Sequence, residues 1–137
     1  MPDKVFFDSN VLIYAMVLGD PRRDRAQQLL AQGGIVSVQV LNEFVAIARR
    51  KMHMSWEDVV EALDAIRILF PSPVAIAVET HEAALRIAQQ HGYGIYDAMI
   101  VAAALAAKCS TLYSEDVQDG QVIDEQLTIQ NPFRLPA

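Results

Sequence analysis

The sequence has little cysteine, no long apolar run and fewer basic than acidic residues. A single cysteine, Cys109, excludes an intrachain disulfide. No apolar run reaches the ~18 residues of a membrane-spanning helix. The N-terminus also lacks the basic start and apolar segment of a signal peptide ahead of the first expected strand. We therefore expect a protein of the reducing cytoplasm without a membrane partner.

The charge balance limits the ways in which this chain can bind nucleic acid. The net charge of −6 argues against binding through global charge, because such binding neutralises phosphates with Lys and Arg. A nucleic-acid partner therefore needs a local basic patch, although cations at a helix end are also favoured without any ligand. The candidate clusters are Arg22, Arg23 and Arg25 in one turn, and Arg49, Arg50, Lys51 and His53 at the end of an amphipathic segment.

The chain is long enough and apolar enough to bury a sizeable core. Its 137 residues are 53% hydrophobic, and no repeat, linker or low-complexity segment interrupts them, so we expect a single domain over residues 1–137. Apolar periodicity and turn residues predict helices over 11–18, 23–32, 40–52, 56–69, 80–91 and 97–108. They predict strands over 4–7, 35–38, 73–78, 111–114 and 126–130.

The order of these elements predicts the fold class. Strands that alternate with helices indicate an α/β fold whose central, mostly parallel sheet is covered on both faces, giving three layers. The consecutive helices 40–52 and 56–69 should form a helical hairpin, and helix 97–108 is apolar nearly all round, which predicts burial. In open sheets of this kind, sites form beyond the carboxyl ends of the strands.

Two carboxylates occupy unusual positions in the first half of the chain. Asp8 ends the apolar run in "VFFDSNVLIY", where it could simply cap the next helix. Glu43 lies on the same helical stripe as Val40 and Phe44, so it points toward the core or its rim. A carboxylate on that stripe is costly without a partner.

Two further acids occupy comparable positions in the second half. Asp97 opens the buried helix, where it could be an N-cap, and Asp116 follows the strand 111–114 in a turn rich in acids. Because the ends of parallel strands converge, these acids should repel Asp8 and Glu43 and either take up protons or hold a cation. Ligands that are all oxygen favour Mg²⁺ or Mn²⁺. The implied chemistry is metal-assisted phosphoryl transfer.

Several segments together carry a family resemblance. In order, "FFDSNVLIY", "LNEFVAIARRK", "YGIYDAMIVAAAL" and "LYSEDVQDGQ" resemble the PIN-domain ribonucleases, and most closely the VapC-type toxins of bacterial toxin–antitoxin pairs. The resemblance covers nearly the whole chain. It implies a PIN-like fold with a protruding helical hairpin and a metal-dependent endoribonuclease that uses Mg²⁺ or Mn²⁺. It also implies a cognate antitoxin and a homodimer.

The same resemblance assigns roles to individual residues. It implies that Asp8, Glu43, Asp97 and Asp116 are the catalytic and metal-binding acids, with Asn10 and Ser114 as polar companions. Ser114 stands where the family often has Thr, which preserves the hydroxyl. Asp119 is a further acid of undefined role. If the chain binds RNA, the patch Arg49, Arg50 and Lys51 is the expected phosphate contact.

Two alternatives remain open at this point. A phosphatase of the haloacid-dehalogenase kind also places an Asp after its first strand and uses Mg²⁺. It normally needs a second Asp two residues further on, where this chain has Asn10. The other alternative is a non-catalytic RNA- or protein-binding module with the PIN-like fold, which would be more plausible if acids were missing.

Overall fold

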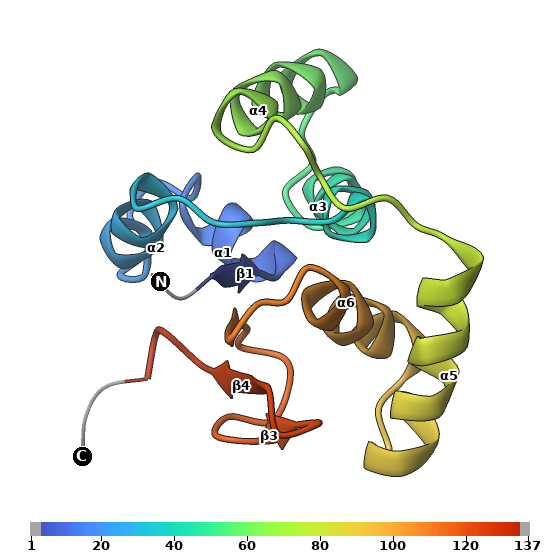
Figure 1. The fold of residues 1–137 in the computed structure, drawn as a ribbon. Helices are drawn as coiled ribbons and strands as arrows, with labels where there is room; N and C mark the ends of the chain where they lie inside the picture. The colour runs from blue at the N-terminus through green and yellow to red at the C-terminus, as the bar shows by residue number, and fades with distance from the viewer. Residues whose placement is uncertain (1–3, 135–137) are drawn as a thin grey trace.

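A computed structural model describes residues 4–134 and shows a mixed α/β fold around one sheet (Figure 1). The sheet order is β1-β2-β4-β3, with β1 (Val5–Phe7), β2 (Thr111–Tyr113), β3 (Val122–Ile123) and β4 (Leu127–Gln130). The pairs β1–β2 and β2–β4 are parallel, and the short β3 is antiparallel to β4. The expected mostly parallel central sheet is therefore confirmed.

Helices cover both faces of this sheet. They are α1 (Ser9–Tyr14), α2 (Arg23–Ala31), α3 (Val38–Arg50), α4 (Trp56–Leu69), α5 (Val78–His91) and α6 (Ile95–Ala106). Figure 1 shows the strands between α1 and α2 on one side and α6 and α5 on the other, which is the expected α/β/α layering. Among residues 4–134, none of the helices is long and apolar enough to span a bilayer.

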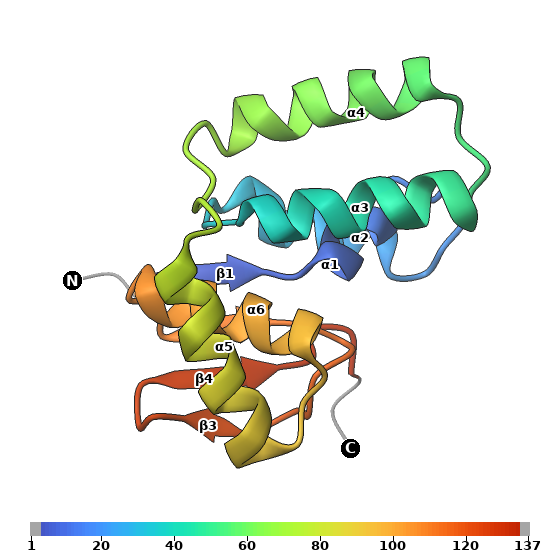
Figure 2. The ribbon, with the colours of Figure 1, turned by 90° about the vertical axis from the view of Figure 1, so that its right-hand side faces the viewer.

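The hairpin of α3 and α4 protrudes beyond the layered core, as expected (Figure 2). Ser37 and Ser55 begin the two helices as N-caps, because their hydroxyls accept hydrogen bonds from the backbone N–H groups of Val40 and Asp58, at 3.2 and 3.1 Å. Helix α4 is only partly buried, and most of its residues are exposed.

Two of the strand predictions are wrong. Segment 35–38 makes only isolated parallel bridges, from Ile35 to Phe6 and from Ser37 to Val74, because Ser37 already caps α3. Segment 73–78 keeps only the bridge at Val74, and its later apolar residues are exposed. Gly34 allows the first bridge, since a Cβ there would lie 2.5 Å from the Phe7 ring.

Several helix boundaries also differ from those expected. Helix α1 begins at Ser9 and ends at Tyr14, so the chain turns into a helix directly after Asp8. Helix α5 begins at Val78, and Thr80 is not its N-cap: the Thr80 hydroxyl accepts a hydrogen bond from the Ala77 N–H at 3.4 Å. Helix α6 begins at Ile95 after Gly94, which places Asp97 inside the first turn.

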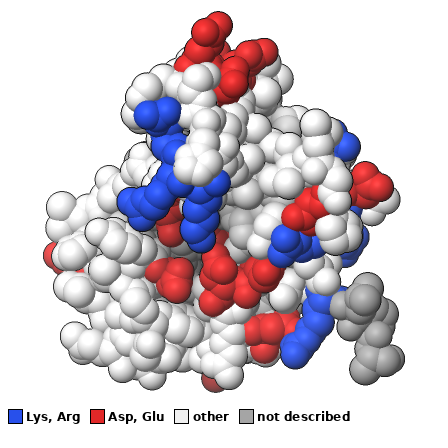
Figure 3. Space-filling model, turned by 180° about the vertical axis from the view of Figure 1, so that it is seen from behind, with Lys and Arg blue, Asp and Glu red and all other residues white. Residues whose placement is uncertain are grey.

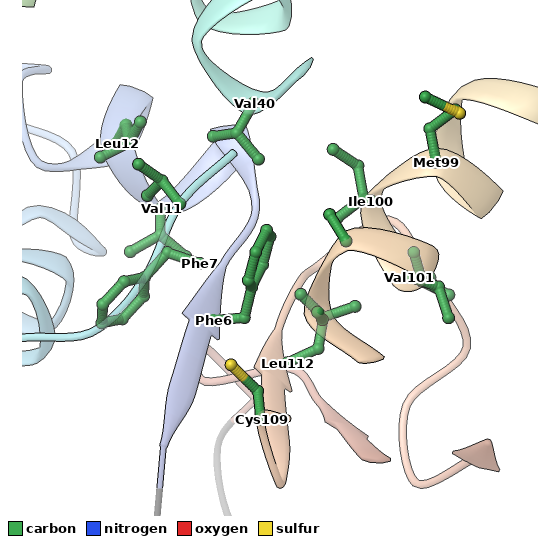
Figure 4. Packing of buried hydrophobic residues seen from close by; sticks show 14 of the residues in the cluster. Phe6, Phe7, Val11, Leu12, Val40, Met99, Ile100, Val101, Cys109 and Leu112 are labelled. Atoms are coloured by element: carbon green, nitrogen blue, oxygen red, sulfur yellow. The ribbon is translucent and has the colours of Figure 1, made fainter. Parts of the chain in front are cut away.

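The core fixes β1 from both sides. Alternating side chains of a strand point to opposite faces, and Figure 4 shows Phe6 pointing toward Ile100 and Leu112 while Phe7 points to the other side of β1. The Phe7 ring packs against the rings of Phe70 and Tyr113, each at a centroid distance of 5.8 Å. The strand that ends at Asp8 is thus held by packing on both faces.

Candidate active site

Asp8 is both a helix cap and a buried carboxylate. It is only 2% exposed, and its Oδ1 accepts a 2.7 Å hydrogen bond from the N–H of Ser9 at the start of α1. Its Oδ2 accepts a 2.7 Å bond from the hydroxyl of Ser114. Burial raises the pKa of Asp8 to about 6, against the lowering effect of these hydrogen bonds, and the charges of Asp116 and Asp97 add to the rise. Capping α1 uses only Oδ1, so the capping role does not explain the hydrogen bond that Oδ2 accepts from Ser114.

Ser114 and Asn10 connect the ends of β1 and β2. The Ser114 oxygen accepts hydrogen bonds from the N–H groups of Asp116 and Val117, at 3.2 and 3.3 Å, while its hydroxyl donates to Asp8. The Asn10 side-chain amide donates to Asp116 Oδ2 at 3.2 Å. Asp116 itself is exposed. Both predicted polar companions therefore contact the predicted acids.

Glu43 reaches the same region from α3. Burial, together with the charges of Asp8, Asp97 and Asp116, raises its pKa to about 7. Its Oε2 is buried and has no hydrogen-bond partner in the described part of the chain. The apolar stripe of α3 thus directs this carboxylate toward the other three acids, as the sequence predicts.

Asp97 reaches the site from the first turn of α6. Its pKa is raised by burial and by the charge of Asp116. Since Gly94 is the N-cap of α6, the capping alternative for Asp97 is wrong. An acid in a first turn is also favoured by the helix dipole, which helps to keep a partly buried carboxylate near other acids.

The four acids are close enough to influence one another, but they do not form a closed cage. Among residues 4–134, no group of three acidic, His or Cys side chains is already arranged to hold a metal ion. The donor set nevertheless fits Mg²⁺ or Mn²⁺, which prefer oxygen ligands and usually retain several waters. Two buried oxygens, Glu43 Oε2 and Asn10 Oδ1, lack hydrogen-bond partners in this part of the chain and could bind a cation or its water.

A basic edge borders the surface formed by the four acids, the acidic hollow. Figure 3 shows Asp and Glu side chains gathered on one face, with Lys and Arg side chains next to them. Arg50 lies seven residues after Glu43 on the same face of α3, and Lys51 follows it; both are exposed. Arg49 differs, because it donates to the carbonyl of Met54 at 2.8 Å and lies 4.4 Å over the Trp56 ring.

Two acidic side chains near the site have partners that sequence reasoning missed. Asp119 accepts hydrogen bonds from the N–H of Asn131 at 2.8 Å and from Arg134 at 2.7 Å, which lower its pKa. It therefore joins two loops. Glu115 pairs with Arg22, which the sequence suggested only as part of a basic cluster. Nothing in local spacing indicates either pairing.

An apolar groove lies apart from the acids, between α4 and the helices α1 and α2. Its volume is about 300 Å³, and its lining includes Leu12, Met16, Leu30, Ala65, Ile66 and Leu69. Of the two hairpin helices, α4 contributes to this lining and α3 does not. In the structure, the groove uses α4 together with α1 and α2.

Comparison with known proteins places these features in a family. The family described as "PIN domain" matches residues 5–119. Comparison with curated protein sequences finds no match. Solved structures with the same fold include VapC20 of Mycobacterium tuberculosis, described as a toxin that cleaves the sarcin-ricin loop. It is 23% identical, with a TM-score of 0.67 over 82% of this chain and 90% of that chain.

Two other solved structures are toxin–antitoxin assemblies. A toxin–antitoxin complex from Klebsiella pneumoniae matches with a TM-score of 0.70 and 20% identity, over 96% of this chain and 100% of that chain. VapBC2 from Rickettsia felis, bound to a DNA fragment from its promoter, matches with a TM-score of 0.66 and 19% identity, over 92% and 96%. At these identities the structures show a shared fold.

Proposed function

This chain belongs to the PIN-domain family, and from its acidic site we propose that it is a Mg²⁺- or Mn²⁺-dependent endoribonuclease and the toxin of a toxin–antitoxin pair. The observation that carries the proposal is that Asp8, Glu43 and Asp97 converge from three separate elements, near enough for charges among the four acids to raise their pKa values. Among the described residues, the buried Glu43 Oε2 also has no hydrogen-bond partner. Like charges brought together in this way favour a bound cation. The family match favours a nuclease over the haloacid-dehalogenase alternative.

The proposed mechanism assigns a role to each acid. Asp8 and Asp97 would hold the cation, Asp116 would complete the site directly or through water, and Glu43 would bind the cation or orient the attacking water. When bound, such an ion lowers the pKa of water and offsets charge on the phosphate undergoing attack. Ser114 and Asn10 keep Asp8 and Asp116 in place through hydrogen bonds. Arg50 and Lys51 bind phosphates of the RNA strand next to the acidic hollow.

The test is RNA cleavage by the purified protein in Mn²⁺ and in chelator, with Asp97→Asn beside the wild type. Asn keeps the shape of Asp but loses the charge that holds the cation. We expect cleavage only with metal, and a loss of more than about a hundredfold in the variant, because even groups that only support metal ligands contribute 10–100-fold. Asp58→Asn, at an exposed acid of α4, serves as the control.

The same assay separates this function from the second candidate, a non-catalytic binding module. That alternative predicts RNA or protein binding without cleavage in any metal. Wild-type activity in Asp97→Asn would also reject the site assignment. In either case the circular dichroism spectrum must show that the variant remains folded.

The proposed antitoxin has two surfaces to bind. The apolar groove between α4, α1 and α2 fits an apolar helix or strand, since exposed apolar surface of this kind marks interaction sites. The acidic hollow attracts an Arg, whose planar fork pairs with carboxylates. A complex whose interface avoids both surfaces would reject this arrangement. Homodimerisation and a cytoplasmic location remain part of the proposal.

A further inference from the structure

One arginine joins two loops beside the acidic site. Arg22, in the loop between α1 and α2, donates from Nε and Nη2 to the carboxylate of Asp20, at 2.9 and 2.8 Å. Its Nη1 donates to both oxygens of Glu115, at 3.3 and 3.4 Å. Glu115 lies in the loop that follows β2. A single guanidinium therefore connects segments that are 93 residues apart in sequence.

A ring contact and a backbone hydrogen bond also restrain the orientation of this guanidinium. Its central carbon lies 3.6 Å from the centroid of the Tyr14 ring, which is a cation–π contact. The backbone N–H of Arg22 also donates to Asp20, at 2.8 Å, so the loop closes on itself. A lysine could supply the charge but neither the planar stacking nor the fork of donors. The arrangement depends on arginine specifically.

Glu115 lies between two residues of the proposed site. Ser114 precedes it and donates to Asp8, and Asp116 follows it and accepts from Asn10. Because the Asp116 side chain is exposed, packing does not fix its position. Its place depends on the backbone around it and on hydrogen bonds. A restraint on Glu115 is therefore a restraint on Asp116.

We propose that Arg22 is a positioning residue, which holds Glu115 and so keeps Asp116 oriented toward the cation and the RNA. The catalytic part of this inference rests on the proposed function, whereas its effect on cation binding does not require RNA. The competing role for Arg22 is direct contact with an RNA phosphate. That role would need the guanidinium to leave Glu115, and it predicts a different response to mutation.

The experiment compares Arg22→Gln, Glu115→Gln, the double variant and Arg22→Lys. Mn²⁺ binding is measured by calorimetry without RNA, and cleavage is measured as kcat and KM. We expect each variant to weaken Mn²⁺ binding and to lower kcat by about tenfold, with KM within about twofold of the wild type, as for other groups that orient a metal ligand. The double variant should be no worse than either single variant, and Arg22→Lys should not restore function.

The matched control is Arg134→Gln, which breaks another Arg–Asp pair, Arg134 with Asp119, on the same side of the molecule. It should leave both Mn²⁺ binding and kcat unchanged. Unchanged Mn²⁺ binding in Arg22→Gln would overturn the proposal. A raised KM with unchanged kcat, relieved by Arg22→Lys, would instead identify a phosphate contact. If the wild type does not cleave RNA, the Mn²⁺ titration still decides the role of Arg22.

Discussion

The acidic site and the apolar groove are assembled from the chain in different ways. The site joins Asp8 to Ser114 and Asn10 to Asp116, pairs that are each 106 residues apart. The groove is lined by residues between Leu12 and Leu69, from the first half of the chain. The site is also held by hydrogen bonds from neutral polar side chains to carboxylates, whereas the groove is lined mainly by apolar side chains.

This difference implies that reaction and docking can be altered separately. A charge introduced in the groove should leave the carboxylates unchanged, and a neutralised carboxylate should leave the groove unchanged. The site and the groove share two segments, α1 and the loop between α1 and α2. Helix α1 carries Asn10 of the site and Leu12 of the groove lining. In the loop, Met16 lines the groove and Arg22 pairs with Glu115. Reaction and docking should therefore be most separable for substitutions outside these two segments.

The largest expected effect is on docking. Ala65→Arg places a charge in the apolar groove, which must be desolvated when a partner binds. We expect its affinity for the proposed antitoxin to fall by more than about a hundredfold, with RNA cleavage unchanged. Ile68→Arg is the control, because Ile68 lies on the same helix, is 81% exposed and does not line the groove. Equal binding by Ala65→Arg and wild type would show that the partner docks elsewhere.

The next effect is on metal-dependent stability. Mn²⁺ should raise the melting temperature of the wild type, since a ligand at a hundredfold excess over its dissociation constant stabilises the folded state by about 2.7 kcal/mol. This increment should shrink strongly in Asp8→Asn and Asp97→Asn and persist in Ala65→Arg. In chelator, both Asn variants should be at least as stable as the wild type. Thermal melts check this, and equal shifts in all the proteins would place the ion elsewhere.

A comparable effect should appear in the dependence of stability on pH. The pKa of Asp8 is about 6 in the folded protein and 3.8 ordinarily. The protonated Asp8 side chain therefore contributes fully to the free energy of unfolding below pH 4, and this contribution is lost as the pH rises through 6. In chelator, Asp8→Asn should therefore gain roughly 2–3 kcal/mol relative to the wild type between pH 4 and pH 8. Urea denaturation at both pH values measures this gain. Ala65→Arg should follow the wild type, and a constant difference for Asp8→Asn would contradict the burial argument.

The smallest effect concerns the basic edge. Replacing Arg50 and Lys51 by Ala should weaken binding to many RNA sequences alike, and each lost phosphate contact should reduce the salt slope by about one. Arg49→Ala should change the slope less, because Arg49 is already bound to Met54 and Trp56. Filter binding at several salt concentrations provides the measurement, with a catalytically inactive background. An unchanged slope would make the edge an ordinary solvated helix end.

Local sequence patterns predict where two of the buried or half-buried carboxylates lie, but they predict too many strands. Asp8 and Glu43 could be located because the end of an apolar strand and an apolar helical stripe are local patterns. The segments 35–38 and 73–78 have similar apolar content, yet they form only bridges, since Ser37 begins α3 and Val78 begins α5. Local pattern cannot show which of two neighbouring elements will take a shared residue.

The individual pairings between distant segments could not be read from residue spacing. The bond from Asn10 to Asp116 and the pair Arg22–Glu115 depend on how the loops meet in three dimensions. The same holds for Arg49, whose cluster looked uniformly basic but whose side chain stacks on Trp56. Residue type and spacing indicate which chemical groups are present, and the fold determines which of these groups contact one another.

The separation of groove and site along the chain also orders them in time during synthesis. Every residue that lines the groove is translated by Leu69, whereas the site is incomplete until Asp116 has left the ribosome. At about 5–20 residues per second, translation needs several seconds to cover that interval. A nascent chain therefore carries the docking residues before it carries a complete set of acids.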